Sequence, residues 1–136
     1  MASVEDHLRQ WRHNRDFLAS IEPAYADWQI TLIFYVALQA VDALLVHDKV
    51  QGVHSHDIRN QVLKSTNRYQ QIWHCYRPLH DMSRKVRYLT NPGFWIPSDQ
   101  MEANVLKRYL YPIEKSVSKI TGSPLGGETV ALRKSS

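Results

Sequence analysis

The sequence has only one cysteine, Cys75, among its 136 residues. A single thiol cannot form an internal disulfide, and its place in an aromatic stretch with helical spacing predicts a buried small side chain rather than a reactive group. The first residues, Met-Ala-Ser-Val-Glu-Asp, lack the cationic and apolar regions of a secretory signal peptide. We therefore expect a cytoplasmic protein without disulfides.

Glycine is also scarce, and its one cluster, Gly122 to Gly127, lies near the C-terminus. No glycine-rich turn joins a strand to a helix, which excludes the phosphate loops of Rossmann and P-loop nucleotide folds. Metal ligands are few as well. His54 and His56 flank one serine, His47 precedes them, and there is no His-Glu-x-x-His pair. Two imidazoles on one loop do not complete a tetrahedral zinc site, so we expect neither a metal nor another cofactor.

What the chain does contain is the composition of an ordinary globular domain, with 43% hydrophobic and 22% charged residues. Its length suits a single domain with a packed core. The 17 Lys and Arg residues outnumber the 13 Asp and Glu, and ten of the cations are arginine, whose planar fork suits phosphate. This mild excess is compatible with a nucleic-acid or nucleotide partner, although by itself it adds little.

The longest apolar run, Trp28 to Val46, predicts a helix that is long enough to cross a bilayer. Asp42 would cost about 2.5–3.5 kcal/mol at membrane depth, so the central helix of a soluble bundle is favoured over a membrane span. The polar residues of this helix share one line along it: Asp27, Thr31, Tyr35, Gln39 and Asp42. This polar stripe either makes interhelical hydrogen bonds or forms the wall of a ligand site.

Two further helices are predicted on either side of this run by apolar residues at spacings of three and four. Val4–Ile21 begins with a capping box formed by Ser3 and Asp6. A shorter helix, His56–Ser65, follows an N-cap at Ser55. Both starts are defined by local side-chain chemistry.

The second half of the chain predicts two more helical stretches. Tyr69–Leu89 has helical spacing, although Pro78 should kink it or divide it in two, and Asn91-Pro92-Gly93 should end it. A last helix is predicted from the N-cap Ser98 to the C-cap Gly122. These segments together predict an all-α fold, an up-and-down bundle of four to five helices over residues 1–121. Residues 122–136 are expected to form a disordered tail.

Several clusters of residues follow one another in a fixed order: Asp27-Trp28, Phe34-Tyr35, Ala37-Leu38, Val41-Asp42-Ala43, His54-Ser55-His56 with Arg59, Tyr76-Arg77 with Leu79, Ser83-Arg84 and Arg87-Tyr88. Together they resemble a bacterial branch of the HEPN superfamily of small helical domains. They extend over most of the chain from Leu8 to Tyr88. The resemblance implies a bundle of four to five helices that pairs as a homodimer across the helices holding the active cleft.

The same resemblance implies an RNA or nucleotide ligand. Many members of the family are metal-independent ribonucleases of toxin–antitoxin and defence systems, while others bind nucleotides or partner a nucleotidyltransferase. The cleft that it implies here is formed by Tyr35, Gln39, Asp42, His54, His56, Arg59, Ser83, Arg84, Arg87 and Tyr88.

The catalytic signature of the family is an arginine followed, after four to six residues, by a histidine. Arg68 and His74 match it, but ten Arg and seven His would produce roughly one or two such spacings by chance. Gln39 stands where relatives often carry histidine, and an amide cannot act as a base at neutral pH. The motif is therefore degenerate, which favours a binding or a purely structural role.

Three functions remain open at this point. The leading one is an RNA- or nucleotide-binding module that uses Arg59, Arg84 and Arg87. The second is a metal-independent endoribonuclease that uses Arg68 with His74, or one of His54, His56 and His80 with a neighbouring arginine. The third is a non-catalytic dimeric adaptor or antitoxin-like subunit, in which Asp42 pairs with an arginine and the polar network only specifies packing.

Overall fold

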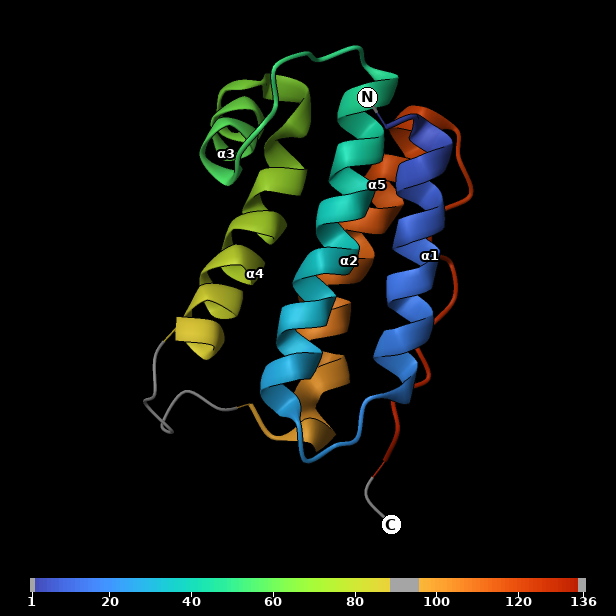
Figure 1. Ribbon diagram of the computed structural model, residues 1–136, viewed down its shortest axis with the longest axis vertical. Coiled ribbons are helices and arrows are strands. Elements are labelled where there is room, and N and C mark those ends of the chain that lie inside the picture. Colours follow the sequence, from blue (N-terminus) through green and yellow to red (C-terminus); the bar gives the residue numbers. More distant parts are fainter. Residues whose placement is uncertain (1, 89–95, 135–136) are drawn as a thin grey trace.

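The structure is a computed structural model that describes residues 2–88 and 96–134. Consecutive long helices run in opposite directions, which confirms the expected all-α bundle (Figure 1). The five α-helices are α1 (Val4–Ser20), α2 (Ala26–His47), α3 (His56–Ser65), α4 (Gln70–Tyr88) and α5 (Tyr111–Thr121). The short elements are the 3₁₀ turns η1 (Asn67–Tyr69) and η3 (Ser98–Gln100) and the π-helix η4 (Glu102–Leu110), which leads directly into α5. No strand occurs in these described ranges.

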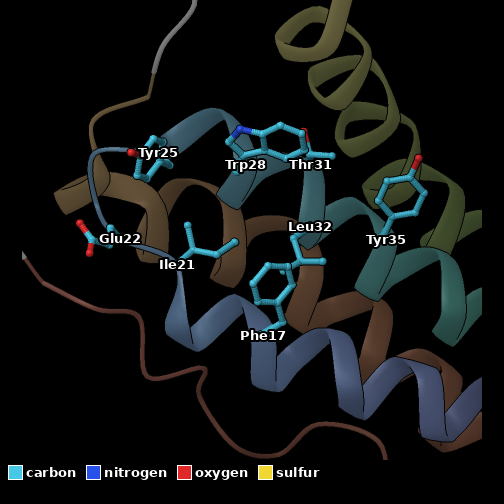
Figure 2. Close-up of a pocket in the computed structure, with 8 residues that line it drawn as sticks. All are labelled: Phe17, Ile21, Glu22, Tyr25, Trp28, Thr31, Leu32 and Tyr35. Carbon is cyan, nitrogen blue, oxygen red and sulfur yellow. The ribbon is translucent and has the colours of Figure 1, made fainter.

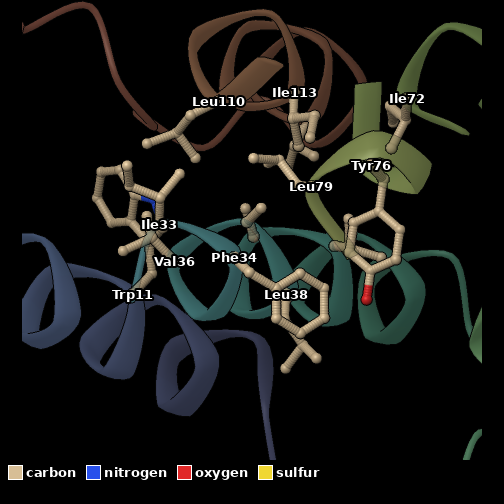
Figure 3. Close-up of a cluster of buried hydrophobic side chains, with 14 of the residues drawn as sticks. Trp11, Ile33, Phe34, Val36, Leu38, Ile72, Tyr76, Leu79, Leu110 and Ile113 are labelled. Atoms are coloured by element: carbon tan, nitrogen blue, oxygen red, sulfur yellow. The ribbon is translucent and has the colours of Figure 1, made fainter. Parts of the chain in front are cut away.

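The central element is α2, which packs against α1, α4 and α5. By length and composition it could cross a bilayer, but 67% of its most apolar window is buried inside the bundle. Figure 3 shows why, because side chains from α1, α4 and the α5 region meet those of α2 in one core. Each of the four long α-helices contributes core residues, for example Trp11 of α1, Phe34 of α2, Leu79 of α4 and Ile113 of α5. The apolar surface of α2 is thus covered by protein, as in the core helix of a soluble domain.

Three of the predicted helix ends agree with the structure, whereas Ser98, the predicted N-cap of one last helix, lies in η3, and that stretch is divided into η3, η4 and α5. Ser3 and Asp6 form the capping box of α1, and the Ser55 hydroxyl accepts a hydrogen bond from the Ile58 amide (3.2 Å) at the start of α3. At the other end of the bundle, Gly122 adopts a left-handed conformation (φ 74°) as the C-cap of α5. These features are local, which is why sequence alone could predict them.

Helix α4 differs in one respect from its prediction. It continues through Pro78 as one α-helix, so the division that was one of the two predicted effects of the proline does not occur. Tyr76 and Leu79, which precede and follow the proline, are both buried in the core and hold the helix on each side of it. The predicted end at residues 91–93 lies outside the described residues.

The C-terminal segment also differs from its prediction. Residues 122–134 have no helix or strand, but Leu125 and Val130 are buried in the core. The Val130 amide donates to the Tyr111 hydroxyl (2.8 Å), and the Arg15 guanidinium donates to the Glu128 carbonyl (3.0 Å). Leu125 and Val130 are five positions apart, a spacing that fits neither the helix nor the strand period, so the expectation of a disordered tail missed them.

A buried charge joins the first and last helices. Glu114 of α5 is 1% exposed and accepts hydrogen bonds from Trp11 Nε1 (2.8 Å), Arg15 Nε (2.7 Å) and Arg15 Nη2 (2.9 Å), all from α1. Each oxygen of the carboxylate has a donor, which is what a buried charge requires. The network fixes how α1 docks on α5.

Candidate functional site

The predicted site residues do not all lie in one place. Four of them lie together in the hollow between the start of α3 and the second half of α4, which has a volume of about 380 Å³. We call it the His–Arg cleft, and its lining residues are Ser55, His56, Asp57, His80, Arg84, Arg87 and Tyr88. The cleft forms because His80, Arg84 and Arg87 follow each other at spacings of four and three on α4, while Ser55 caps α3 beside them.

Arg87 is held in a fixed position. Its Nε and Nη2 donate to the carbonyl and hydroxyl of Ser83 (3.1 and 3.3 Å), and its Nη1 donates to the Tyr35 hydroxyl (2.8 Å). The guanidinium also lies 5.6 Å from the centroid of the Tyr35 ring and 5.2 Å from that of Tyr88. Three of its five N–H groups are thus used, and the others remain for a ligand.

Arg84 is different from Arg87. Its side chain is exposed, and it makes no hydrogen bond or ion pair with any residue that the structure describes. Because it lines the same cleft, its guanidinium is available to a ligand without breaking an existing contact.

Two imidazoles, those of His56 and His80, line the same cleft as these cations. His80 is 7% exposed and stacks on the Phe34 ring with a centroid distance of 4.9 Å and an interplanar angle of 8°. Its ring centroid is 5.0 Å from that of His56. Asn60 Nδ2 lies 3.1 Å from His80 Nδ1, and Arg59 Nη1 lies 3.4 Å from His56 Nδ1.

Burial and nearby cations favour the neutral form of both rings. The pKa of His56 is lowered by burial and then by the Arg59 and Arg87 guanidiniums. The pKa of His80 is lowered by burial and then by His56 and Arg84. At neutral pH both imidazoles are therefore uncharged hydrogen-bonding groups.

Arg59 does not reach the ligand side of the cleft, because it is paired with Asp42. The guanidinium Nε and Nη2 donate to the two carboxylate oxygens (2.7 and 3.2 Å), and Arg59 is 8% exposed. This bidentate pair joins α3 to α2. The expected pairing of Asp42 with an arginine therefore occurs at Arg59, while Arg84 and Arg87 face the open cleft.

Gln39 and His54 lie elsewhere. A hydrogen bond of 2.8 Å joins Gln39 Oε1 to His7 Nδ1 of α1. A step of four residues overshoots one helical turn by about 40°, which turns Gln39 away from Tyr35 and towards α1. His54 lines a separate hollow of about 390 Å³ with His7 and Asp42, walled mainly by aliphatic side chains. The polar stripe of α2 thus makes hydrogen bonds on two sides of the helix, from Tyr35 to α4 and from Gln39 to α1.

The Arg68 and His74 pair is not assembled into a site. Arg68 lies in η1 and forms a salt bridge with Asp48 (2.8 Å), whereas His74 is exposed on α4. Neither lines the His–Arg cleft. Cys75 is partly buried, and burial raises the pKa of its thiol. In the described ranges, no group of three or more His, Cys, Asp or Glu residues is placed to hold a metal ion.

Sequence reasoning left Asp57 out of the site, and it named His80 only as one candidate histidine of the endoribonuclease, not as a residue of the binding cleft. The signal for His80 was present, because it stands four residues before Arg84 and seven before Arg87 on one helix face. Asp57 had no such signal, since its position follows from how α3 docks on α4.

A third hollow, of about 440 Å³, lies between the end of α1 and the start of α2 (Figure 2). We call it the aromatic groove, and its lining residues are Phe17, Ile21, Glu22, Tyr25, Trp28, Thr31, Leu32 and Tyr35. Phe17, Tyr25 and Trp28 are 57%, 54% and 59% exposed, which is unusual for such large apolar side chains. Tyr35 connects this groove to the His–Arg cleft through its hydrogen bond with Arg87.

The His–Arg cleft therefore combines two guanidiniums, two neutral imidazoles and one carboxylate, Asp57. With two positive charges and one negative charge, its formal charge is +1. In comparisons with known proteins, no family model, no curated protein and no solved structure matches this chain.

Proposed function

We propose that this chain is a HEPN-type module that binds RNA or a nucleotide by holding a phosphate group in the His–Arg cleft. The observation that carries the proposal is the convergence of Arg84 and Arg87 with His56 and His80 on one open hollow. Guanidinium groups bind phosphate through short, charge-assisted hydrogen bonds. One of these cations is held by three hydrogen bonds and the other has no partner among the described residues, so both can serve a ligand.

The start of α3 supports the same proposal. The first backbone N–H groups of a helix have no partner within it, and the Ser55 hydroxyl takes only that of Ile58. The amides of His56 and Asp57 thus add positive partial charge on the side where the guanidiniums lie. The negative charge of Asp57 opposes this positive potential, so removing it tests whether the ligand is negatively charged.

The resemblance to the HEPN superfamily adds the biological setting of the proposal. It supports a cytoplasmic homodimer with a nucleotidyltransferase or antitoxin partner, acting in a toxin–antitoxin or defence system. The pairing of Asp42 with Arg59 does not argue against a ligand, because the two arginines of the cleft remain outside that pair.

The test is fluorescence anisotropy of a labelled single-stranded RNA, with mononucleotides as competitors, at low and moderate salt. Arg84→Ala should weaken binding by about 10- to 100-fold, since a hydrogen bond to a charged group contributes about 1.5–3 kcal/mol. The melting temperature should stay nearly unchanged, because Arg84 is exposed and has no described partner. Arg77→Ala removes an exposed arginine of α4 outside the cleft and is the matched control.

Asp57→Asn provides a change of opposite sign. Removing one negative charge from the cleft should strengthen binding by about two- to fivefold, in line with a Coulomb energy of about 1 kcal/mol near water. Wild-type protein that binds neither RNA nor nucleotides at micromolar concentration would refute the proposal and favour the non-catalytic adaptor.

A second candidate, the metal-independent endoribonuclease, is favoured by one observation, the 5.0 Å distance between the rings of His56 and His80. In such a reaction one imidazole takes the proton of the RNA 2′-hydroxyl while O2′ bonds to phosphorus. The other, as imidazolium, donates a proton to the leaving 5′-oxygen, which yields a 2′,3′-cyclic phosphate.

Cleavage is tested with a mixed RNA pool in the presence of a chelator. The ribonuclease hypothesis requires cleavage that His56→Ala or His80→Ala abolishes and that His74→Ala leaves intact, because His74 lies outside the cleft. An RNA pool left whole by the wild-type protein rejects it.

A further inference from the structure

We infer that both imidazoles of the His–Arg cleft are hydrogen-bond donors, each neutral ring carrying its proton on Nε2, so that the cleft receives a phosphate oxyanion without cleaving its ester. This inference rests on the proposed function and deepens it. It decides between the two candidates by the proton positions of His56 and His80.

The proton position of His56 follows from its contact with Arg59. The two residues are three positions apart on α3, which places Arg59 Nη1 3.4 Å from His56 Nδ1. A guanidinium can only donate, so Nδ1 must be the acceptor and carry no proton. A neutral ring then has its proton on Nε2. Arg59 cannot turn away, because Asp42 holds it by two hydrogen bonds.

The proton position of His80 follows from its contact with Asn60, the residue after Arg59 on α3. Asn60 Nδ2 lies 3.1 Å from His80 Nδ1, while Asn60 Oδ1 is buried without a partner. The reversed amide would instead bury an unpaired NH₂ group, and buried N–H groups without a partner are rarer than buried carbonyls without one. The observed orientation is therefore favoured, and it makes Nδ1 of His80 an acceptor as well.

One helix thus sets the proton positions of both rings. Adjacent residues of α3 occupy the Nδ1 atoms, which leaves the Nε2–H groups for a ligand in the cleft. Together with Arg84 and Arg87 they form four donor side chains, and this set suits the oxygens of a phosphate. A general base needs a free lone pair facing the 2′-hydroxyl, and here the lone pair of each ring is already bonded.

The direct test is NMR of the wild-type protein with ¹⁵N-labelled histidine, without ligand, at pH 7.5. Two-bond couplings identify the protonated nitrogen of each ring, and His56→Gln and His80→Gln assign the signals. We expect Nε2–H in both rings. A ring found mainly in the Nδ1–H form overturns the inference, whether or not the protein binds RNA.

The donation of both Nε2–H groups to a phosphate is tested by titrating the same sample with inorganic phosphate and then with a dinucleotide. Both Nε2 resonances should shift, and the dinucleotide should stay intact. Resonances that do not move while RNA binds elsewhere overturn the donor role. Cleavage abolished by His56→Ala overturns it too, whereas absence of any binding rejects the proposed function and leaves the proton positions to the first experiment.

Asn60→Asp is designed to reverse the role of His80. A carboxylate accepts a hydrogen bond from Nδ1–H, so the ring should change to the Nδ1–H form and lose its donor at Nε2. RNA affinity should fall by about tenfold or more, the size expected for losing a hydrogen bond to a charged group. Asn104→Asp, which adds the same charge at an exposed position of η4, is the matched control. Unchanged couplings and affinity in folded Asn60→Asp contradict the inference.

Arg59 is tested without leaving Asp42 unpaired. The double variant Asp42→Asn with Arg59→Gln removes both charges together, and His56 should then show a mixture of tautomers while His80 stays as in the wild type. If His56 keeps a pure Nε2–H form in this folded variant, Arg59 does not set its proton position.

Discussion

At the scale of the residue, Arg59 and Arg84 show how burial changes the role of one side-chain type. Arg59 is 8% exposed and makes a bidentate pair with Asp42, while Arg84 is exposed and unpaired among the described residues. The same guanidinium thus fixes a helix at one position and is available to a ligand at the other.

We expect Arg59→Ala to destabilise the protein by about 3–5 kcal/mol, because it leaves Asp42 as a largely buried carboxylate without its partner. Chemical denaturation measures this change. Arg9→Ala is the control, since the side chain of Arg9 is 75% exposed in its pair with Asp6 and such pairs contribute about 0–1 kcal/mol. Equal losses in the two variants would contradict the structural role of Arg59.

The two cleft histidines predict how stability depends on pH. Their pKa values are lowered in the folded protein, so below the ordinary value of about 6.5 the unfolded chain binds more protons. Stability should therefore be complete above pH 6.5 and should decrease as the pH falls below it. Melting curves between pH 7.5 and 5.5 measure this decrease, and His80→Gln should make it smaller. A protein that becomes more stable on acidification in this range would show the opposite linkage.

At the scale of the element, α3 is short but carries much of the site. Its ten residues supply His56 and Asp57 to the cleft, Arg59 to the pair with Asp42, and Asn60 to His80. Its position is set by packing on α4 and by the Arg59 pair with α2. A change that loosens the start of α3 should therefore reach the ligand site directly.

Ser55→Ala, compared with Ser3→Ala, should show whether the α3 cap affects RNA affinity beyond its effect on stability. Loss of an N-cap costs about 0.5–2 kcal/mol, and here it also frees the first turn that carries His56. We expect lower RNA affinity as well as a lower melting temperature. Ser3→Ala removes the cap of α1, so its melting temperature should fall similarly while affinity stays unchanged. Equal affinities in both variants would show that the α3 cap does not order the site.

At the scale of the whole molecule, the aromatic groove predicts self-association. Phe17, Tyr25 and Trp28 are more than half exposed around an apolar hollow that adjoins the cleft through Tyr35. Light scattering at micromolar concentration should show a homodimer. Trp28→Glu should dissociate it, because a charge in an apolar interface is costly. A wild-type monomer at this concentration would refute the prediction.

The sequence by itself determined the all-α fold and several of the helix ends, although not the division of the last predicted helix into η3, η4 and α5. The capping box of Ser3 and Asp6, the N-cap Ser55 and the C-cap Gly122 act within a few residues of chain, and the apolar run of α2 already required a surrounding bundle. Such features depend on local geometry and on the period of the helix, which the order of residues contains.

Only the tertiary structure decided which polar groups meet. Arg87 reaches Tyr35 across 52 positions of the chain, and Glu114 meets Trp11 across 103. Tertiary packing also places Gln39 against His7 and keeps Arg68 and His74 outside the cleft. It buries Leu125 and Val130 of the C-terminal segment. The physical reason is that docking angles and rotations of helices depend on side-chain packing over the whole core, which no local spacing specifies.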